Sequence, residues 1–312
     1  MKASDLLLMV EGRQRHKGNG YLAGNTRKSK MASAKRNKVN HVRHLACATS
    51  EICGVTKEVF LLVLMVSAPM NFERRERQRH TCLNVSGVSG KRIEKLFLLG
   101  DSGNSSLNMR IKEESLKFQD VFIGDYHDSY GNLTLKTLSG MKWARLCCPQ
   151  ATYVMKVDDD VYINFKILID TLINAPRKKG YIVGRVSRGS RPVRDKTHKW
   201  YVSLDTYSRK VYPDYVSGLA YVMSGDLPRK IYYTSISTPP FPWEDVYIGM
   251  ILEKLNVRPK HNTCFQTFKT RRKIKFPCKF ISACAIHFMD PENVFRHYNK
   301  LTTEKTNATN RC

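Results

Sequence analysis

Three consecutive aspartates interrupt an apolar, strand-forming stretch of this chain. Asp158, Asp159 and Asp160 follow a mostly apolar run over residues 153–157, and a second apolar run begins at Val161. Adjacent buried carboxylates destabilise a fold unless a cation or hydrogen bonds compensate their charge. Because side chains alternate between the faces of a strand, we expect Asp158 and Asp160 to share one face and Asp159 to occupy the other.

The aspartate triplet is a candidate metal site. Carboxylate oxygens suit Mg²⁺ or Mn²⁺, which keep open positions for the phosphates of a nucleotide. The alternative is an acidic triplet in a solvated loop, and composition alone favours that alternative. The apolar residues on both sides favour the metal site, because a solvated turn usually carries Gly, Pro or Ser there.

Length and charge divide the chain into two expected parts. A chain of 312 residues with 42% hydrophobic content can bury a core as one large α/β domain or two smaller ones. Residues 1–50 contain eleven Lys or Arg and two acids, and they contribute to a net charge of +26. This composition predicts a basic, disordered N-terminal segment over residues 1–58 and a folded part over residues 59–312.

The net charge also suggests an anionic partner. A second basic run, residues 258–279, contains no acid. It favours a solvated basic face or loop over a surface that binds nucleic acid, substrate or membrane. The most apolar run, residues 59–69, is shorter than the roughly 20 residues that a membrane-spanning helix needs.

The nine cysteines indicate disulfides rather than a zinc site, because none of them form the CxxC pairs typical of zinc ligands. Cys264, Cys278 and Cys284 cluster late in the chain, which is typical of disulfides formed in an oxidising compartment. Secretion is also compatible with four Asn-x-Ser/Thr sequons, at Asn84, Asn104, Asn132 and Asn307.

The order of the apolar segments predicts an α/β fold. Buried strands are expected at residues 59–67 and 95–100, a helix at 111–118 and another strand at 120–123. A long helix over residues 128–147 then leads into the aspartate strand. This order indicates a mostly parallel sheet with helices on both faces. Ligand sites in such sheets lie beyond the carboxyl ends of the strands, where the aspartate triplet falls.

The second half of the chain adds strands and one long irregular segment. Residues 181–184 and 215–224 are predicted as strands. Residues 185–213, rich in Arg, Lys, Trp and Tyr, are predicted to be irregular and to cover substrate. Glu244 and Asp245 follow a Pro/Trp turn at the start of an apolar helix, where they serve either as N-terminal helix acids or as site residues.

Seven segments in a fixed order resemble the beta-1,3-galactosyltransferase family, which includes beta-1,3-N-acetylglucosaminyltransferases. An isolated Asp-Asp-Asp motif would be weak support, but the similarity covers about residues 59–260. The matching segments are residues 65–69, 73–81, 128–138, 156–164, 199–203, 215–224 and 244–249.

The resemblance implies a fold, a location and a reaction. It implies an A-type glycosyltransferase fold, in which a Rossmann-like half that binds the nucleotide sugar joins an acceptor half, with residues 59–312 as the catalytic domain. It implies a Golgi membrane protein with a lumenal catalytic domain, Mn²⁺ as cofactor and a UDP-sugar donor. The implied reaction is inverting transfer of a hexose, galactose or N-acetylglucosamine, to a glycan acceptor in beta-1,3 linkage.

The resemblance also assigns roles to the acids. Asp160 would bind the metal directly, Asp158 would hold the metal and the donor, and Asp159 would lie near the ribose or the sugar. The metal would neutralise charge that develops on the leaving UDP. Asp245 would be the base that takes the proton of the acceptor hydroxyl, and Glu244 would orient the acceptor or the base.

Three basic residues complete the expected site. Arg79 and Lys136 match basic residues of the donor half, so the resemblance implies that they contact the nucleotide or its phosphates. On spacing alone, the arginines of residues 73–80 instead favour an exposed helix with salt bridges. His287 would complete the metal shell, as a late histidine does in some relatives, or have no such role.

The sequence departs from the family pattern in four places. Cys82 stands where the Arg-rich motif usually ends in Trp, and Ala220 stands where the strand of residues 215–224 usually has a second Gly. Residues 1–58 supply no transmembrane helix of the kind the family has, and the similarity is weak after about Lys260. Neither changed residue removes a proposed catalytic carboxylate.

Two other functions stay open at this point. A catalytically silent lumenal relative that binds glycans is suggested by Cys82 and Ala220. A basic nucleic-acid-binding protein is suggested by the net charge, but the sequence has no recognisable motif for it, and carboxylates at the sheet edge would repel phosphate. We therefore expect an enzyme whose partners are a UDP-sugar and a glycan on protein or lipid, and no nucleic acid.

Overall fold

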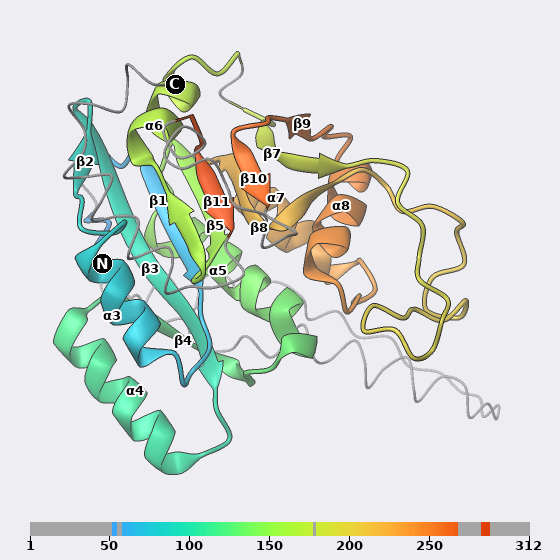
Figure 1. Ribbon diagram of the computed structural model, residues 1–312, viewed down its shortest axis with the longest axis horizontal. Helices are drawn as coiled ribbons and strands as arrows, with labels where there is room; N and C mark the ends of the chain where they lie inside the picture. Colours follow the sequence, from blue (N-terminus) through green and yellow to red (C-terminus); the bar gives the residue numbers. More distant parts are fainter. Residues whose placement is uncertain (1–51, 55–57, 177–178, 268–281, 288–312) are drawn as a thin grey trace, which may run out of the picture. The chain divides into compact units, whose positions relative to one another are not determined.

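The computed structural model shows an α/β fold (Figure 1) over four described ranges, residues 52–54, 58–176, 179–267 and 282–287. Almost all of the predicted disordered segment, residues 1–58, lies outside these ranges, as does much of the basic run of residues 258–279. Within the described ranges, no helix is long and apolar enough to cross a bilayer.

The first half of the main sheet is parallel, as the sequence predicted. β1 (Leu61–Val66) lies between β3 (Lys91–Asp101) and β5 (Tyr153–Asp158) and pairs with both in parallel. β4 (Val121–His127) pairs in parallel with β3. Every residue of β1 is buried, as expected for a strand that is covered on both faces.

The second half of the sheet is mixed, although most strand pairs of the whole sheet are parallel, as predicted. β8 (Tyr215–Ser224) pairs antiparallel with β5 and with β7 (Ile182–Ser187). If β8 were parallel to β7, the segment between them would have to cross over the sheet, usually as a helix. Residues 188–214, all of them described, contain no helix. The beginning of β8 therefore lies beside the end of β5. β2 (Gly87–Val88), antiparallel to β3, lies with β4 at one edge of the sheet, and β9 (Lys260–His261), parallel to β7, lies at the other edge.

Helices cover both faces of the sheet, as predicted. Leu62 and Leu64 of β1 belong to one buried cluster, whereas Val63 and Met65 belong to a second cluster on the opposite face. The first cluster includes side chains of α5 (Leu133–Cys147), α7 (Leu227–Ile236) and α8 (Glu244–Lys254). The second includes side chains of α4 (Ser105–Phe118) and α6 (Phe165–Ile173).

The predicted helix of residues 128–147 is shorter than expected. A 3-10 turn, η1 (Tyr130–Asn132), precedes α5. Asp128 belongs to the sheet edge instead, because its carboxylate accepts a hydrogen bond from Gly100 N at 2.7 Å and its own N–H donates to the Asp101 carbonyl at 2.7 Å.

The three aspartates lie at the end of a strand and in the turn after it. β5 ends at Asp158, Asp159 and Asp160 form a turn, and β6 (Val161–Ile163) follows. The expectation that all three aspartates lie on one strand is therefore wrong, because the chain leaves the main sheet at Asp158. Asp158, Asp159 and Asp160 are called the acid turn below. β6 joins a second sheet with β10 (Phe265–Thr267) and β11 (Ala285–His287).

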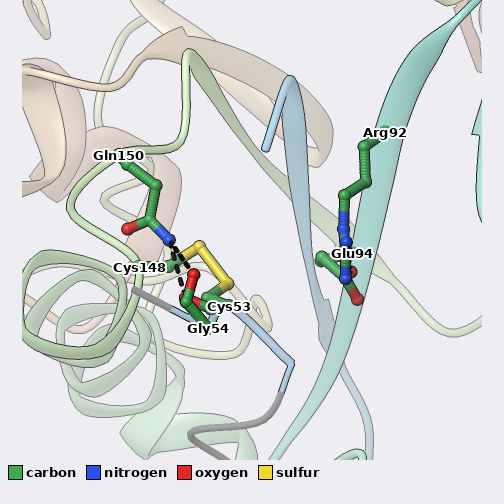
Figure 2. The surroundings of a disulfide bond; sticks show 6 residues. All are labelled: Cys53, Gly54, Arg92, Glu94, Cys148 and Gln150. Carbon is green, nitrogen blue, oxygen red and sulfur yellow. Dashed lines mark hydrogen bonds and ion pairs between the residues drawn. A yellow bond between two sulfur atoms is a disulfide. The ribbon is translucent and has the colours of Figure 1, made fainter. Parts of the chain in front are cut away.

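Disulfides hold two of the described segments in place. Cys264 and Cys284 are bonded beside β10 and β11, which confirms the expected late disulfide, whereas Cys278 lies outside the described residues. Cys53 is bonded to Cys148 at the end of α5 (Figure 2). Gln150 Nε2 supports this link by donating to the Cys53 carbonyl at 2.6 Å.

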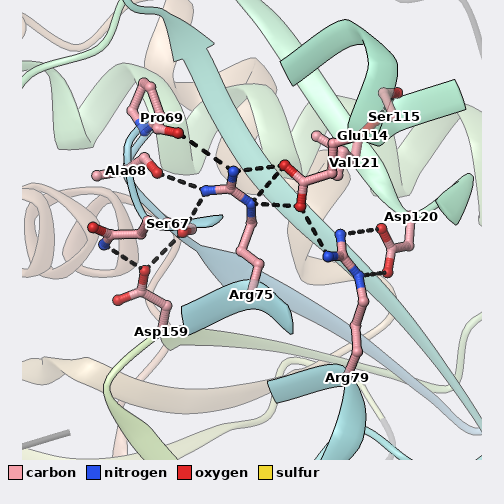
Figure 3. A network of polar contacts seen from close by, with 11 residues as sticks. Ser67, Ala68, Pro69, Arg75, Arg79, Glu114, Ser115, Asp120, Val121 and Asp159 are labelled. Carbon is pink, nitrogen blue, oxygen red and sulfur yellow. Dashed lines mark hydrogen bonds and ion pairs between the residues drawn. The ribbon is translucent and has the colours of Figure 1, made fainter. Parts of the chain in front are cut away.

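Buried arginine contacts attach α3 (Phe72–His80) to the rest of the fold. Arg75 is fully buried, and its Nη2 lies 2.6 Å from Glu114 Oε2 on α4 (Figure 3). Arg75 also donates to the carbonyls of Ala68 and Pro69. The expectation of an exposed helix with surface salt bridges is therefore wrong for Arg75, whose charge is compensated in the interior.

Arg79 is held by the same group of side chains. Its guanidinium nitrogens lie 2.8 Å from Asp120 and 2.8 Å from Glu114, as Figure 3 shows. Its guanidinium carbon lies 4.8 Å from the ring centroid of Phe97 and 4.0 Å from that of Phe118. These contacts give Arg79 a structural role, and its contact with the nucleotide or its phosphates stays a prediction.

Replacing Arg75 should destabilise the fold far more than replacing a neighbouring arginine. We expect Arg75→Met to lower the free energy of unfolding by about 3–5 kcal/mol, because Glu114 is then buried without its main partner. Arg77→Met, at a partly exposed position of the same helix, should change it by less than about 0.5 kcal/mol. Urea unfolding of both variants measures the difference, and equal effects would contradict the buried pair as the anchor of α3.

Candidate active site

Asp159 fixes the acid turn against the beginning of α3. Its carboxylate accepts hydrogen bonds from Ser67 Oγ at 2.7 Å, Asn71 Nδ2 at 2.8 Å and Arg74 Nη1 at 3.2 Å. Gln78 Nε2 donates to the Asp159 backbone carbonyl at 2.9 Å. These protein partners compensate the buried carboxylate. The contact of Asp159 with a ribose or sugar stays a prediction.

Asp160 and His287 are neighbours although 127 positions separate them in the numbering. β11 pairs antiparallel with β6, so His287 lies opposite Val161, and His287 Nε2 is 3.3 Å from Asp160 Oδ2. The hydrogen bond that His287 donates to Asp160 raises the pKa of His287 against the opposing effect of burial. The other oxygen, Asp160 Oδ1, is buried and has no hydrogen-bond partner among the residues that the structure describes. Such an oxygen is free to accept a ligand.

The Asp160 and His287 side chains suit a divalent ion. Carboxylate oxygen and imidazole nitrogen are both ligands of Mn²⁺-type ions, and Asp158 is close enough to contribute to the electrostatic environment of His287. Within the described part of the chain, no cluster of three or more His, Cys, Asp or Glu side chains is arranged to hold a metal. Donor phosphates would therefore have to supply further ligands, as they do for Mg²⁺ in phosphate-transfer sites.

Lys156 connects the acid turn to α8. Its Nζ donates to Asp158 Oδ1 at 2.7 Å and to the Gly218 carbonyl, and it lies 3.6 Å from Glu244 Oε2. Burial lowers the pKa of Lys156, but the two carboxylates outweigh this effect and raise the pKa overall. Lys156 therefore stays protonated and balances acids from both ends of the site.

Glu244 is an interior residue of the site. Besides its contact with Lys156, Glu244 Oε1 accepts a hydrogen bond from Tyr221 Oη at 2.7 Å, and its side chain is buried. Burial raises the pKa of Glu244, and the charge of Lys156 opposes that shift. Glu244 is thus engaged by two β-strand residues, which suits a role in orienting its neighbour.

Asp245 is more open than Glu244. One carboxylate oxygen accepts from Val246 N at 2.9 Å and the other from Gly218 N at 3.4 Å. Burial raises the pKa of Asp245 above the ordinary aspartate value, although these backbone N–H groups oppose the shift. The carboxylate lies in the first turn of α8, where the helix dipole also stabilises its negative charge. Asp245 is therefore a carboxylate that two backbone N–H groups hold in place and whose pKa is raised.

Lys136 is placed away from the open part of the site. Its side chain is buried, and Nζ donates to the Ser67 carbonyl at 2.6 Å and lies 2.8 Å from Asp128. Burial lowers the pKa of Lys136, and Asp128 opposes that shift. Lys136 therefore supports the loop after β1, and its contact with the nucleotide or its phosphates stays a prediction.

Sequence analysis did not single out Lys156, Tyr221 or Arg74 as site residues. Lys156 carries a detectable signal, because it is a lysine inside an otherwise apolar strand and needs counter-charges there. Arg74, unlike Arg79, has a guanidinium group that contacts the acid turn. No pattern in the sequence distinguishes Arg74 from the neighbouring arginines, because their directions depend on how α3 packs.

The two changed residues of the family pattern are accommodated in the core. Cys82 is a buried free thiol, and burial raises its pKa to about 11, so it is an inert thiol at neutral pH. Ala220 is fully buried and pairs with Val157 of β5. Neither residue displaces a carboxylate of the site.

Comparisons with known proteins agree with this arrangement. The family model described as Galactosyltransferase matches residues 73–263. Beta-1,3-galactosyltransferase 1 of Mus musculus is 36% identical over 249 residues, which are 79% of this chain and 75% of the relative, and that of Homo sapiens gives the same values. Beta-1,3-galactosyltransferase 2 of Homo sapiens is 37% identical over 256 residues, 81% of this chain and 61% of the relative.

Two solved structures are also similar. One is the apo structure of the bifunctional glycosyltransferase WbbM, with a TM-score of 0.42 and 9% identity over 75% of this chain and 46% of that one. The other is a glycosyltransferase involved in glycosylation of the major capsid of PBCV-1, with a TM-score of 0.42 and 10% identity over 77% of this chain and 99% of that one. The sequence matches confirm the resemblance found from the motifs, and the chain belongs to the galactosyltransferase family.

Proposed function

We propose that this chain is an inverting hexosyltransferase that moves galactose or N-acetylglucosamine from a UDP-sugar to a glycan acceptor in beta-1,3 linkage. The observation that supports it most directly is the position of Lys156, whose Nζ lies 2.7 Å from Asp158 and 3.6 Å from Glu244. The acid turn and the first residues of α8 are therefore parts of one site. Membership of the galactosyltransferase family supports glycosyl transfer as the reaction.

The donor diphosphate and Mn²⁺ are proposed to bind at the acid turn. Asp160, with its unpartnered buried oxygen, and His287 would hold the ion, and Asp158 would assist. When bound, the ion would neutralise charge on the diphosphate as the bond to the sugar breaks. His287 must lose its proton to become a ligand, so metal binding should release a proton from the Asp160–His287 pair.

Asp245 is proposed as the catalytic base. The acceptor oxygen forms a bond to the anomeric carbon, the bond from that carbon to the UDP oxygen breaks, and UDP leaves with the electron pair. The hydroxyl proton passes to the Asp245 carboxylate, which its backbone contacts hold in place. Glu244 cannot take this role easily because Tyr221 and Lys156 engage it, so it would orient Asp245.

A lumenal location is part of the same proposal. The Cys53–Cys148 and Cys264–Cys284 disulfides suit an oxidising compartment, which agrees with action at the Golgi membrane. The silent-relative and nucleic-acid alternatives are not favoured, because all five proposed acids, Asp158, Asp159, Asp160, Glu244 and Asp245, are present at the site.

Metal-dependent UDP release tests the reaction and the residue roles together. The purified chain is given UDP-galactose or UDP-N-acetylglucosamine with simple glycan acceptors, in Mn²⁺ or in EDTA. We expect turnover with one donor in Mn²⁺ only. Asp160→Asn and Asp245→Asn should each lower kcat by roughly 10²-fold or more, because each removes a group that acts in the transition state.

A matched surface acid controls for the loss of a charge. Asp170→Asn removes a partly exposed carboxylate on α6 that pairs with Lys166 and should leave kcat within about twofold. Thermal unfolding confirms that each variant is folded. Folded Asp160→Asn and Asp245→Asn variants with wild-type turnover would contradict the assigned roles, and a wild-type chain that binds no UDP-sugar would contradict the proposed reaction.

The raised pKa of Asp245 predicts the acid side of the pH profile. A base works in its deprotonated form, so kcat/KM should fall as the pH drops through the folded-state pKa. Because burial raises that pKa, the fall should begin above the ordinary aspartate value of about 4. Rates measured from pH 4 to 8 under saturating Mn²⁺ locate the inflection. The residual activity of Asp245→Asn should lack it, and an unchanged inflection in that variant would assign the base elsewhere.

A further inference from the structure

Two exposed aromatic side chains lie near the proposed base and have no role in the reaction described so far. Tyr130 of η1 is 51% exposed, and Trp200, in the irregular segment after β7, is 52% exposed. Large apolar groups this open are unfavourable in water and often mark a binding surface when they cluster. The two residues are distant in the sequence but in contact in the fold, because Trp200 Nε1 donates a hydrogen bond to Tyr130 Oη at 3.3 Å.

The pair is tied to the segment that carries the catalytic acids. The ring of Tyr130 lies 6.4 Å from that of Trp243, the residue before Glu244. Thr134 Oγ1, four positions after Tyr130, donates to the Phe241 carbonyl at 2.9 Å. The Trp243 carbonyl accepts from Tyr247 N and so begins α8. The exposed rings are therefore positioned by the same turn that positions Asp245.

The segment that carries Trp200 is also well anchored. Arg194 donates to the carbonyls of Val202 and Tyr207 at 2.7 Å each. The ring of Tyr207 packs 5.7 Å from that of Phe241, and Arg209 pairs with Glu253 of α8 at 2.6 Å. A ligand that binds Trp200 would meet a surface that is already ordered, which lowers the entropic cost of binding.

The surroundings of Trp200 are polar rather than apolar. Lys199 Nζ lies 4.2 Å from the ring centroid of Tyr130, and the ring of His198 lies 5.4 Å from that of Trp200. Lys199 lies over the Tyr130 ring, so a cation already occupies one face of that ring, whereas the neighbour of Trp200 is the imidazole of His198. An indole with hydrogen-bonding groups beside it matches a pyranose ring, which has a C–H face and a rim of hydroxyl groups.

We propose that Trp200 is a stacking site for a pyranose ring of the glycan acceptor, and that Tyr130 holds Trp200 in position through its hydroxyl group. The ring bound there is the acceptor's, because Trp243 links the pair to Asp245 rather than to the acid turn. This inference rests on the proposed function and adds the residues that select the acceptor. Trp200 would contact substrate, whereas Tyr130 would act through Trp200.

Acceptor kinetics of three variants of the full chain test this site. Trp200→Ala should raise the acceptor KM by about tenfold, because one aromatic stacking contact is lost. Trp200→Phe should restore most of the affinity, since it keeps an aromatic face. Tyr130→Phe should raise the acceptor KM only about two- to threefold, because it removes the hydrogen bond but not the ring. The KM for the UDP-sugar should stay unchanged in all three.

Tyr233→Ala is the matched control. Tyr233 is 44% exposed on α7 and, like Tyr130, has a cationic neighbour, Arg145, but it has no contact with the Trp243 turn among its described interactions. Its replacement should leave both KM values unchanged. UDP release without acceptor, which reports on the donor site, should be the same in wild type and Trp200→Ala.

The outcomes separate this inference from the proposed function. If the wild-type chain transfers sugar and Trp200→Ala has an unchanged acceptor KM, the stacking site is wrong and the function stands. A rise in the donor KM of Trp200→Ala would also overturn it, by assigning Trp200 to the donor.

If the wild type releases UDP from no donor, the proposed function fails, and the sugar site is then tested by binding alone. Quenching of tryptophan fluorescence by methyl beta-galactoside or methyl beta-N-acetylglucosaminide, lost in Trp200→Phe, would still support the sugar site, and no quenching by either would overturn it.

Discussion

The buried charge of Lys156 determines how the two ends of the site are joined. An ammonium group inside a sheet needs compensation, and this one has Asp158 from its own strand, the Gly218 carbonyl from β8 and Glu244 from α8. β8 supplies the Gly218 carbonyl because it runs antiparallel to β5 with Ala220 opposite Val157, which places Gly218 near the end of β5. One lysine therefore connects the acid turn, at the end of the parallel half of the sheet, to α8, which carries Asp245.

Two other buried cations stabilise the loop after β1, which supports the acid turn. Lys136 donates to the Ser67 carbonyl, and Arg75 donates to the carbonyls of Ala68 and Pro69. Ser67 in turn donates to Asp159. Carbonyls after a parallel strand lack sheet partners and must be satisfied in another way when they are buried. These cations meet that need, so the loop that supports the acid turn is ordered before any ligand binds.

The sequence predicted the parts of the fold that depend on local pattern. The apolar runs that became β1 and β8, and the acids at the end of β5 and at the start of α8, were all found there because each has a signal within about ten residues. The directions of charged side chains were predicted less well. Arg79 and Lys136 matched family positions, but the direction of a basic side chain depends on its partners in the fold. The partners of Arg79, Glu114 and Asp120, are distant in the sequence, and Asp128 meets Lys136 only through the turn between β4 and α5. The position of His287 likewise depends on the pairing of β11 with β6.

The two glycine positions of β8 show why the site tolerates one change and not the other. A Cβ atom at Gly218 would lie 3.5 Å from Asp245 Cβ, which is an ordinary contact, but only 3.0 Å from Glu244 Oε2. At 3.0 Å the Glu244 side chain would have to shift. Glu244 cannot shift freely, because Tyr221 and Lys156 hold its two oxygens. The alanine at position 220 is fully buried opposite Val157, so its methyl group adds to the core and leaves both acids in place. The family's glycine is thus needed where β8 approaches α8 and can be replaced where β8 contacts only the sheet.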